Sequence, residues 1–143
     1  MTATLRHADS EADIAACFPV MQELRPHLAD AAELVERVLR QRGAGYRILA
    51  AWDGAVPVGL AGYRMQENLI RGRFCYVDDL VVREDFRRGG LGARLLDGVA
   101  AETRAQSCRH LVLDTAIDNR LGQRFYFRYG MLPAALRFAM TVD

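Results

Sequence analysis

One stretch of the sequence, residues 76–106, constrains the fold more than any other, because it has the pattern of a strand, a glycine-rich turn and a helix. Residues 76–82 are β-branched, aromatic or apolar except for two adjacent acids. Arg-Arg-Gly-Gly-Leu-Gly follows at positions 87–92, and leucine and valine then recur at helical spacing through Val99. Glycines between a strand and a helix expose backbone N–H groups beside the positive end of the helix dipole. The turn is therefore predicted to bind an anion, most naturally a phosphate group.

The rest of the chain predicts an α/β domain with a mixed sheet. Asp53-Gly54 indicates a hairpin turn between two strands, and Gly130 is placed to close the last helix. The 143 residues suffice for one domain, which we expect to span residues 1–143. The expected strands are 2–7, 46–52, 56–65, 76–82, 109–115 and 136–142, and the expected helices are 10–24, 30–42, 91–106 and 119–129.

Composition limits the location and the partners. The 19 basic residues, all of them arginine, nearly balance the 18 acidic ones, so net charge favours neither nucleic acid nor an anionic membrane. Three cysteines without paired short spacing argue against a disulfide framework or a zinc site and suit a reducing cytoplasm. The N-terminus is too polar for a signal peptide, and no apolar run approaches the roughly 20 residues that span a bilayer. We expect a soluble cytoplasmic protein without a metal.

Spacing excludes two common phosphate-binding motifs. The P-loop requires a lysine, and this chain has none. The dinucleotide-binding fingerprint requires a third glycine where Leu95 stands, three residues after Gly92. The remaining alternative is an ordinary tight connection between strand and helix, although the adjacent arginines favour phosphate binding.

The pattern Arg87-x-x-Gly90-x-Gly92 resembles the acetyl-CoA signature of the GNAT N-acetyltransferase superfamily, Gln/Arg-x-x-Gly-x-Gly/Ala. The likeness covers roughly residues 45–135, with residues 76–83 resembling the fourth strand of the family and residues 119–130 its last helix. It implies a mixed, mostly antiparallel sheet flanked by helices, with a splayed central strand pair. It also implies an enzyme that transfers the acetyl group of acetyl-CoA to a primary amine by direct attack in a ternary complex.

The same resemblance implies how the cosubstrate binds. The central strand would pair with pantetheine through its backbone, and the N–H groups of the turn would hold the pyrophosphate beside two guanidinium groups. An N–H near Val81 would polarise the thioester carbonyl, a contribution of about 3 kcal/mol in acyl transfer. Asn119 would contact pantetheine, with a plain helix N-cap as the alternative role. The expected cofactor-binding residues are Leu80, Val81, Val82, Arg87, Arg88, Gly89, Gly90, Leu91, Gly92, Asn119 and Tyr126.

Tyr126 and Asp78 are the expected catalytic residues by this resemblance. A phenol with a pKa near 10 can protonate the departing sulfur, although packing alone is the alternative for Tyr126. The amine must lose a proton before it attacks, and the first of two adjacent acids is the usual candidate base, often through water. Asp78 and Asp79 alternate along the strand, so only one is expected to face the substrate directly. For Asp78 the alternative is a strand acid without a catalytic role.

The acceptor stays open. Its site is expected between the first two helices and residues 67–72, where Asp78, Asp79 and Glu67 favour a small cationic amine. A protein or peptide N-terminus is the alternative substrate. A module that binds or senses CoA without turnover, and an enzyme acting on nucleotide phosphates, are alternative functions. Phe138 and Met140 of the last expected strand could pack in a homodimer, with a strand in the core of one copy as the alternative.

Overall fold

The computed structural model describes residues 2–143. They form two compact units, the first ending at Val112 and the second spanning Leu113–Asp143. No helix within residues 2–143 is long and apolar enough to cross a membrane. The strands are β1 (Thr4–His7), β2 (Arg47–Asp53), β3 (Val56–Asn68), β4 (Gly72–Val82) and β5 (Leu111–Leu113), and the helices are α1 (Glu11–Ala16), α2 (Phe18–Leu24), α3 (Ala31–Arg42), α4 (Leu91–Ala105), α5 (Arg120–Tyr129) and the short 3₁₀ helix η1 (Glu84–Phe86).

The five strands form one mixed sheet in the order β1-β2-β3-β4-β5. The first four are paired antiparallel with their neighbours in sequence. The chain then crosses through α4 to β5, the kind of connection that joins parallel strands. Gly54 has the positive φ, 62°, that the predicted tight turn between β2 and β3 requires. The predicted fold class is confirmed.

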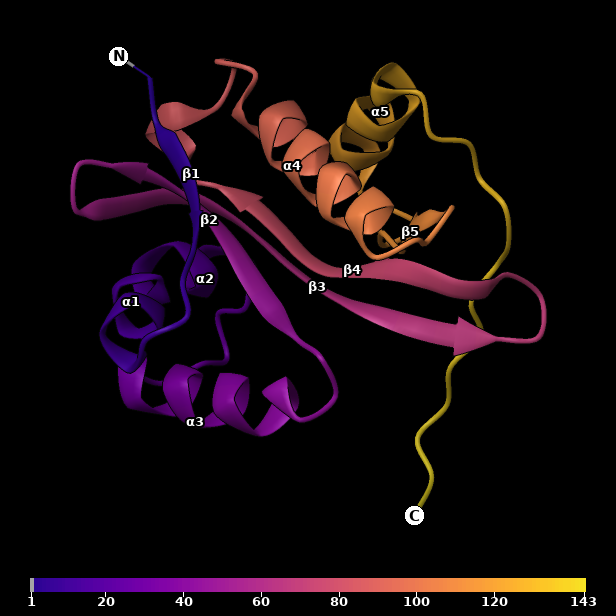
Figure 1. Cartoon of the computed structure of the whole chain (residues 1–143), viewed down its shortest axis with the longest axis horizontal. Coiled ribbons are helices and arrows are strands. Elements are labelled where there is room, and N and C mark those ends of the chain that lie inside the picture. The colour runs from indigo at the N-terminus through magenta and orange to yellow at the C-terminus, as the bar shows by residue number, and fades with distance from the viewer. Residues whose placement is uncertain (1) are drawn as a thin grey trace. The chain divides into compact units, whose positions relative to one another are not determined.

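Helices cover both faces of the sheet in the first unit. Figure 1 shows α4 along one face and α1, α2 and α3 against the other. Leu95, Leu96 and Val99 of α4 are fully buried, which confirms the helical spacing seen in the sequence. The core on the opposite face includes Ile14 and Ile48, both with no exposed surface. The three cysteines are free thiols and all are buried.

The helix predicted for residues 10–24 is two helices, α1 and α2. Ser10 caps the first, since its hydroxyl accepts a hydrogen bond from the Asp13 N–H at 3.1 Å. The chain breaks at Cys17, whose N–H bonds to the Ile14 carbonyl in a tighter turn. Pro19 stands in the first turn of α2 and has no N–H to continue the α-helical ladder. The proline therefore restarts the helix rather than extending it.

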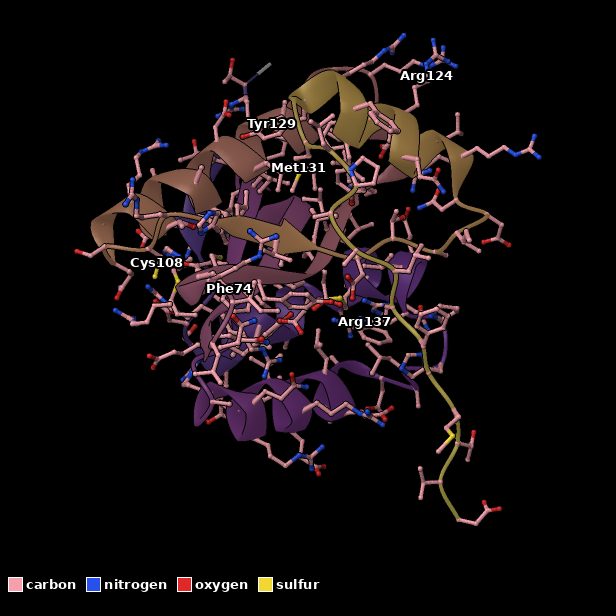
Figure 2. All side chains as sticks on the ribbon, turned by 90° about the vertical axis from the view of Figure 1, so that its right-hand side faces the viewer. Phe74, Cys108, Arg124, Tyr129, Met131 and Arg137 are labelled. Atoms are coloured by element: carbon pink, nitrogen blue, oxygen red, sulfur yellow. The ribbon has the colours of Figure 1, made fainter. Side chains whose placement is uncertain are left out.

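The strand predicted for residues 136–142 does not form, and the one predicted for 109–115 is reduced to β5. Residues 131–143 have no regular secondary structure, and Figure 2 shows the chain beyond Met131 running as an extended segment past Arg137. The alternation that suggested a strand is present, but its apolar side chains are at least 75% exposed. A strand is stable only when its backbone is paired, which alternation alone does not supply. The exposed apolar side chains of this tail are Leu136, Phe138, Met140 and Val142.

Candidate active site

A β-bulge interrupts the pairing of β3 and β4 at the two adjacent acids. Gly62 pairs with Asp79, but the next residue, Tyr63, pairs with Val77, so Asp78 is the additional residue in β4. A bulge bends its strand and redirects side chains. The expectation that only one of the two acids faces the substrate side rested on regular alternation, and the bulge removes that constraint.

Asp79 is held by partners from two other elements. Its Oδ2 accepts a 2.6 Å hydrogen bond from the Tyr46 hydroxyl, and its Oδ1 accepts one of 2.9 Å from Nε of Arg25. The same guanidinium donates through Nη2 to the backbone carbonyl of Asp78. Burial, reinforced by the negative charge of Asp79, raises the pKa of Tyr46, so this phenol stays a donor. Both oxygens of Asp79 thus make structural hydrogen bonds, and its role with a substrate stays a prediction.

Gly62 makes the Tyr46–Asp79 hydrogen bond sterically feasible. A Cβ at this position would lie 1.9 Å from the Tyr46 hydroxyl oxygen and 2.8 Å from Oδ2 of Asp79. Both separations are shorter than any real non-bonded contact of a methyl group. The glycine is therefore required by the close approach of two side chains rather than by its own backbone conformation.

Asp78 has a single charged partner among the contacts of its carboxylate. Nε of Arg64 donates to its Oδ2 at 2.9 Å, and Nη2 of the same arginine reaches Gln41 of α3. Burial raises the pKa of Asp78 above its ordinary value, against the opposing effect of Arg64. A carboxylate that binds a proton more readily is better suited to act as a base near neutral pH.

The turn before α4 has the conformation of an anion-binding loop. Gly90 precedes the helix in the left-handed region with φ of 77°, and Arg88 has φ of 78°, which is uncommon for a residue with a side chain. Within residues 2–143, no side chain forms a capping hydrogen bond at the start of α4. The first N–H groups of a helix have no partner within it, so this end presents unpaired donors and partial positive charge. Gly89, Gly90, Leu91 and Gly92 supply that backbone.

Arg87 is fixed at the same turn. Its Nε donates to the backbone carbonyl of Val82 at 2.9 Å, and its Nη2 lies 3.3 Å from Oε1 of Glu23 in α2. The end of β4 and the start of the turn are therefore linked through one guanidinium group. The remaining capacity of that group is available to an anion held by the turn.

The predicted pantetheine-binding residues lie along β4 next to the bulge. Leu80, Val81 and Val82 pair with β3 on one edge of the strand. On the other edge, the Cys75 N–H donates to the His110 carbonyl at 2.9 Å, just before β5. β5 has three residues and β4 has 11, so β5 cannot cover the whole of this edge. Main-chain groups near Leu80 are those expected to pair with an extended ligand.

The second unit carries the other two predicted residues. Asn119 caps α5: its Oδ1 accepts a 3.1 Å hydrogen bond from the Gly122 N–H, and its Nδ2 donates to Oγ1 of Thr115. Burial raises the pKa of Tyr126, whose ring packs edge-on against Phe125. Both side chains thus have the packing or capping roles named as alternatives. Their contacts with CoA stay predictions.

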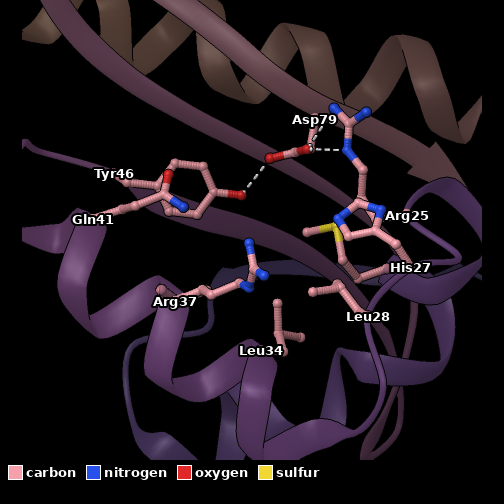
Figure 3. A pocket seen from close by; sticks show the side chains of 10 residues that line it. Arg25, His27, Leu28, Leu34, Arg37, Gln41, Tyr46 and Asp79 are labelled. Atoms are coloured by element: carbon pink, nitrogen blue, oxygen red, sulfur yellow. Dashed lines mark hydrogen bonds and ion pairs between the residues drawn. The ribbon is translucent and has the colours of Figure 1, made fainter. Parts of the chain in front are cut away.

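A cavity of about 250 Å³ opens beside Asp79 in the first unit. Figure 3 shows that α2, α3 and the loop between them supply most of its wall, with Tyr46 and Asp79 on the sheet side. The first two helices were the expected acceptor side, and their residues do line it. Glu67 does not: it stands five positions along β3 from Gly62, roughly 16 Å at the rise of a strand. Its role with a substrate stays a prediction.

Three residues of this cavity carry charge or hydrogen-bonding capacity that sequence reasoning did not identify. They are Arg25, His27 and Arg37. Arg25 and Arg37 are two of 19 arginines and His27 is one of three histidines, and none of the three belongs to a motif. Only their position in the fold distinguishes them. Among residues 2–143, no three His, Cys, Asp or Glu side chains gather closely enough to hold a metal ion.

Residues 11–131 match the model of the acetyltransferase (GNAT) family. No curated protein sequence matches this chain significantly.

Solved structures with the same fold include several acetyltransferases. The aminoglycoside acetyltransferase AAC(6')-Iy, in complex with a bisubstrate analog of CoA, has a TM-score of 0.84 at 18% identity, with 100% of each chain covered. A ribosomal-protein-alanine N-acetyltransferase from Brucella melitensis biovar Abortus 2308 has a TM-score of 0.83 at 19% identity, with 99% of each chain covered. An acetyltransferase from Trypanosoma brucei has a TM-score of 0.81 at 21% identity, covering 98% of this chain and 99% of its own.

Proposed function

This chain belongs to the acetyltransferase (GNAT) family, and from that premise we propose that it transfers the acetyl group of acetyl-CoA to a primary amine of a small molecule. One observation carries the proposal. The bulged acid Asp78, the end of β4 that β5 is too short to pair in full and the glycine-rich turn follow one another within residues 78–92. A thioester bound along this edge, with its pyrophosphate at the turn, would present its acyl group beside the acids.

The proposed reaction requires three groups. Asp78, directly or through a water molecule, takes a proton from the ammonium form of the acceptor. The free amine attacks the thioester carbonyl, whose oxygen is stabilised by a backbone N–H near Val81. The carbon–sulfur bond breaks and Tyr126 gives its proton to the departing sulfur. The attacking nitrogen loses its second proton, which returns through solvent to the Tyr126 phenolate, and the products are an amide and CoA. Attack is direct, because the cysteines are buried and have no part in the scheme.

A small acceptor is favoured by the size of the cavity. Its volume of about 250 Å³ is just below the roughly 300 Å³ at which pockets for drug-sized ligands begin. Similar structures act on different acceptor classes, as the aminoglycoside and ribosomal-protein-alanine enzymes show by their names. A peptide would need an open groove instead, so acetylation of peptides alone would contradict this part of the proposal.

Ligand binding is the first test. Acetyl-CoA and CoA are expected to raise the melting temperature, because a ligand that binds only the folded state stabilises it, whereas ATP and NAD are not. Stabilisation by ATP alone would overturn the proposal in favour of a nucleotide-phosphate enzyme.

Turnover is the second test. A panel of amines is assayed for release of the CoA thiol. Tyr126→Phe is expected to lower kcat by about 10²-fold or more with a much smaller effect on acetyl-CoA binding, since it removes the hydroxyl that donates the proton and keeps the ring. Tyr129→Phe removes a phenol one turn along α5 and serves as the matched control. A Tyr126→Phe protein as fast as wild type would leave packing as the role of this side chain.

We further propose a homodimer and a cytoplasmic location. The dimer is supported by the extended tail, in which four apolar side chains are exposed at alternate positions. The location is supported by three free cysteines, which suit a reducing compartment.

A further inference from the structure

We infer that the acceptor amine carries an anionic group, a carboxylate or a phosphate, which is recognised by Arg37 with His27 in the cavity beside Asp79. The inference deepens the proposed function and rests on it. The observations that carry it are the charge of the cavity wall and the hydrogen-bonding capacity that its side chains retain.

The wall is richer in cations than in anions. Arg25 and Arg37 are its arginines, and Asp79 is its one acid among the described lining residues. Glu33 pairs with Arg37 from just outside the wall, so the wall and this partner together carry two positive and two negative charges, leaving the histidine aside. A cavity built only to attract an ammonium group would be expected to have a negative balance.

The acid of the cavity already accepts hydrogen bonds at both oxygens. The Tyr46 hydroxyl occupies one, and the Arg25 guanidinium occupies the other at 2.9 Å. Its side chain is only 13% exposed. The unused capacity of the site therefore lies with its donors.

Arg37 is the donor best placed to use that capacity. Its Nε and Nη2 both lie against Oε2 of Glu33, at 2.9 and 2.8 Å. Within residues 2–143, no hydrogen bond uses its Nη1. Figure 3 shows this guanidinium reaching from α3 into the middle of the cavity, below the Tyr46–Asp79 hydrogen bond.

The start of α3 holds this guanidinium in place. Asp30 caps the helix by accepting from the Glu33 N–H at 2.8 Å, and Oε1 of Glu33 accepts from the Ala29 N–H at 2.8 Å. This pair is similar to a capping box, with Glu33 reaching one residue before the N-cap, and it fixes the carboxylate that orients Arg37. A guanidinium held in this way loses less conformational freedom when it binds a carboxylate or phosphate oxygen.

His27 and Arg25 complete the donor set. The His27 imidazole lines the cavity from the loop between α2 and α3. Arg25 uses Nε and Nη2 on Asp79 and on the carbonyl of Asp78, which ties the donors to the bulge. An anion at Arg37 would leave the amine of the same small molecule directed toward β4, where the thioester is proposed to lie.

Matched acceptor pairs test the inference. We would compare 4-aminobutyrate with butylamine, and phosphoethanolamine with ethanolamine, by calorimetric binding to the CoA-bound protein and by release of the CoA thiol from acetyl-CoA. The member of a pair that carries the anionic group is expected to bind and react at least about tenfold better than the partner that lacks it. The two pairs distinguish a carboxylate from a phosphate.

Two variants of α3 provide the contrast. Arg37→Gln is expected to remove the preference for the acceptor that carries the anionic group, mainly through KM, and to change the reaction of the simple amine much less. Arg37→Lys keeps the charge but loses the planar fork, so it is expected to retain part of the preference. Arg40→Gln is the matched control, because Arg40 pairs with Glu36 one turn on but does not line the cavity.

The outcomes separate the two proposals. Anion-dependent binding that Arg37→Gln removes, without any turnover, would support the inference and contradict the transferase. Turnover of the simple amines that equals or exceeds that of their partners with an anionic group would contradict the inference and leave the transferase standing. Equal losses for both members of a pair in Arg37→Gln, or the same loss in Arg40→Gln, would also overturn it.

Discussion

Asp78 is both the proposed base and the additional residue of the β-bulge. Its carboxylate is partly buried and accepts a hydrogen bond from Arg64. A base acts only when ionised, so kcat/KM should fall as pH drops through its pKa. Because burial raises that pKa, the acidic limb is expected above pH 4, the region where an ordinary aspartate titrates.

Asp78→Asn is the corresponding prediction. Asparagine keeps an acceptor for Arg64 but cannot take a proton, so kcat/KM should fall by about 10²-fold or more and the acidic limb should flatten. The measurement is the pH profile of kcat/KM for the best acceptor. Asp79→Asn, one residue on, is the control and should keep the limb; a profile that flattens only in this variant would assign the base to Asp79.

At the scale of elements, the turn before α4 depends on one left-handed glycine. Gly90 and Gly54 both have positive φ, and a Cβ at either would meet no atom within 4 Å. Alanine at either position should therefore cost about 1 kcal/mol of unfolding free energy, from backbone conformation alone. Only Gly90→Ala should weaken CoA binding, because only that glycine shapes the proposed pyrophosphate site.

Chemical denaturation and CoA titration of both variants check this prediction. Equal losses of stability with a weaker affinity only in Gly90→Ala are expected. If Gly54→Ala weakened CoA binding as much, the loss would reflect general destabilisation, and the turn would not be a dedicated site.

Local elements were predictable from the sequence, and their tertiary consequences were not. The turn and α4 follow from glycines and helical spacing within 30 residues, and Asp30 caps α3 as its sequence suggests. The bulge depends on the register between β3 and β4. The cavity depends on Tyr46 meeting Asp79 across 33 positions of sequence. The strand predicted for residues 136–142 does not form. Alternation of apolar and polar residues indicates which face of a strand would be buried, but it does not indicate which element would pair with it.

At the scale of the whole molecule, the exposed apolar side chains of the tail, residues 131–143, predict that the protein forms a dimer. Phe138 and Met140 are 90% and 85% exposed, and alternation would put them on one face of an extended segment. Light scattering should give the mass of a dimer. Phe138→Asp with Met140→Asp should give a monomer.

The control uses the opposite face of the same segment. Ala139→Asp with Thr141→Asp adds the same charge between the apolar positions and should disturb the dimer less. A wild-type protein that stays monomeric at all concentrations would contradict the proposed assembly.

The buried cysteines have a practical consequence for the study of this chain. Burial raises the pKa of Cys17 to about 12 and that of Cys75 to about 11. At neutral pH these two side chains are almost entirely in the protonated form, which does not react with disulfide reagents. A chromogenic disulfide such as Ellman's reagent, added to the native protein, should therefore give little background from these side chains. The colour that develops during the reaction then reports the CoA thiol released by turnover rather than the thiols of the enzyme.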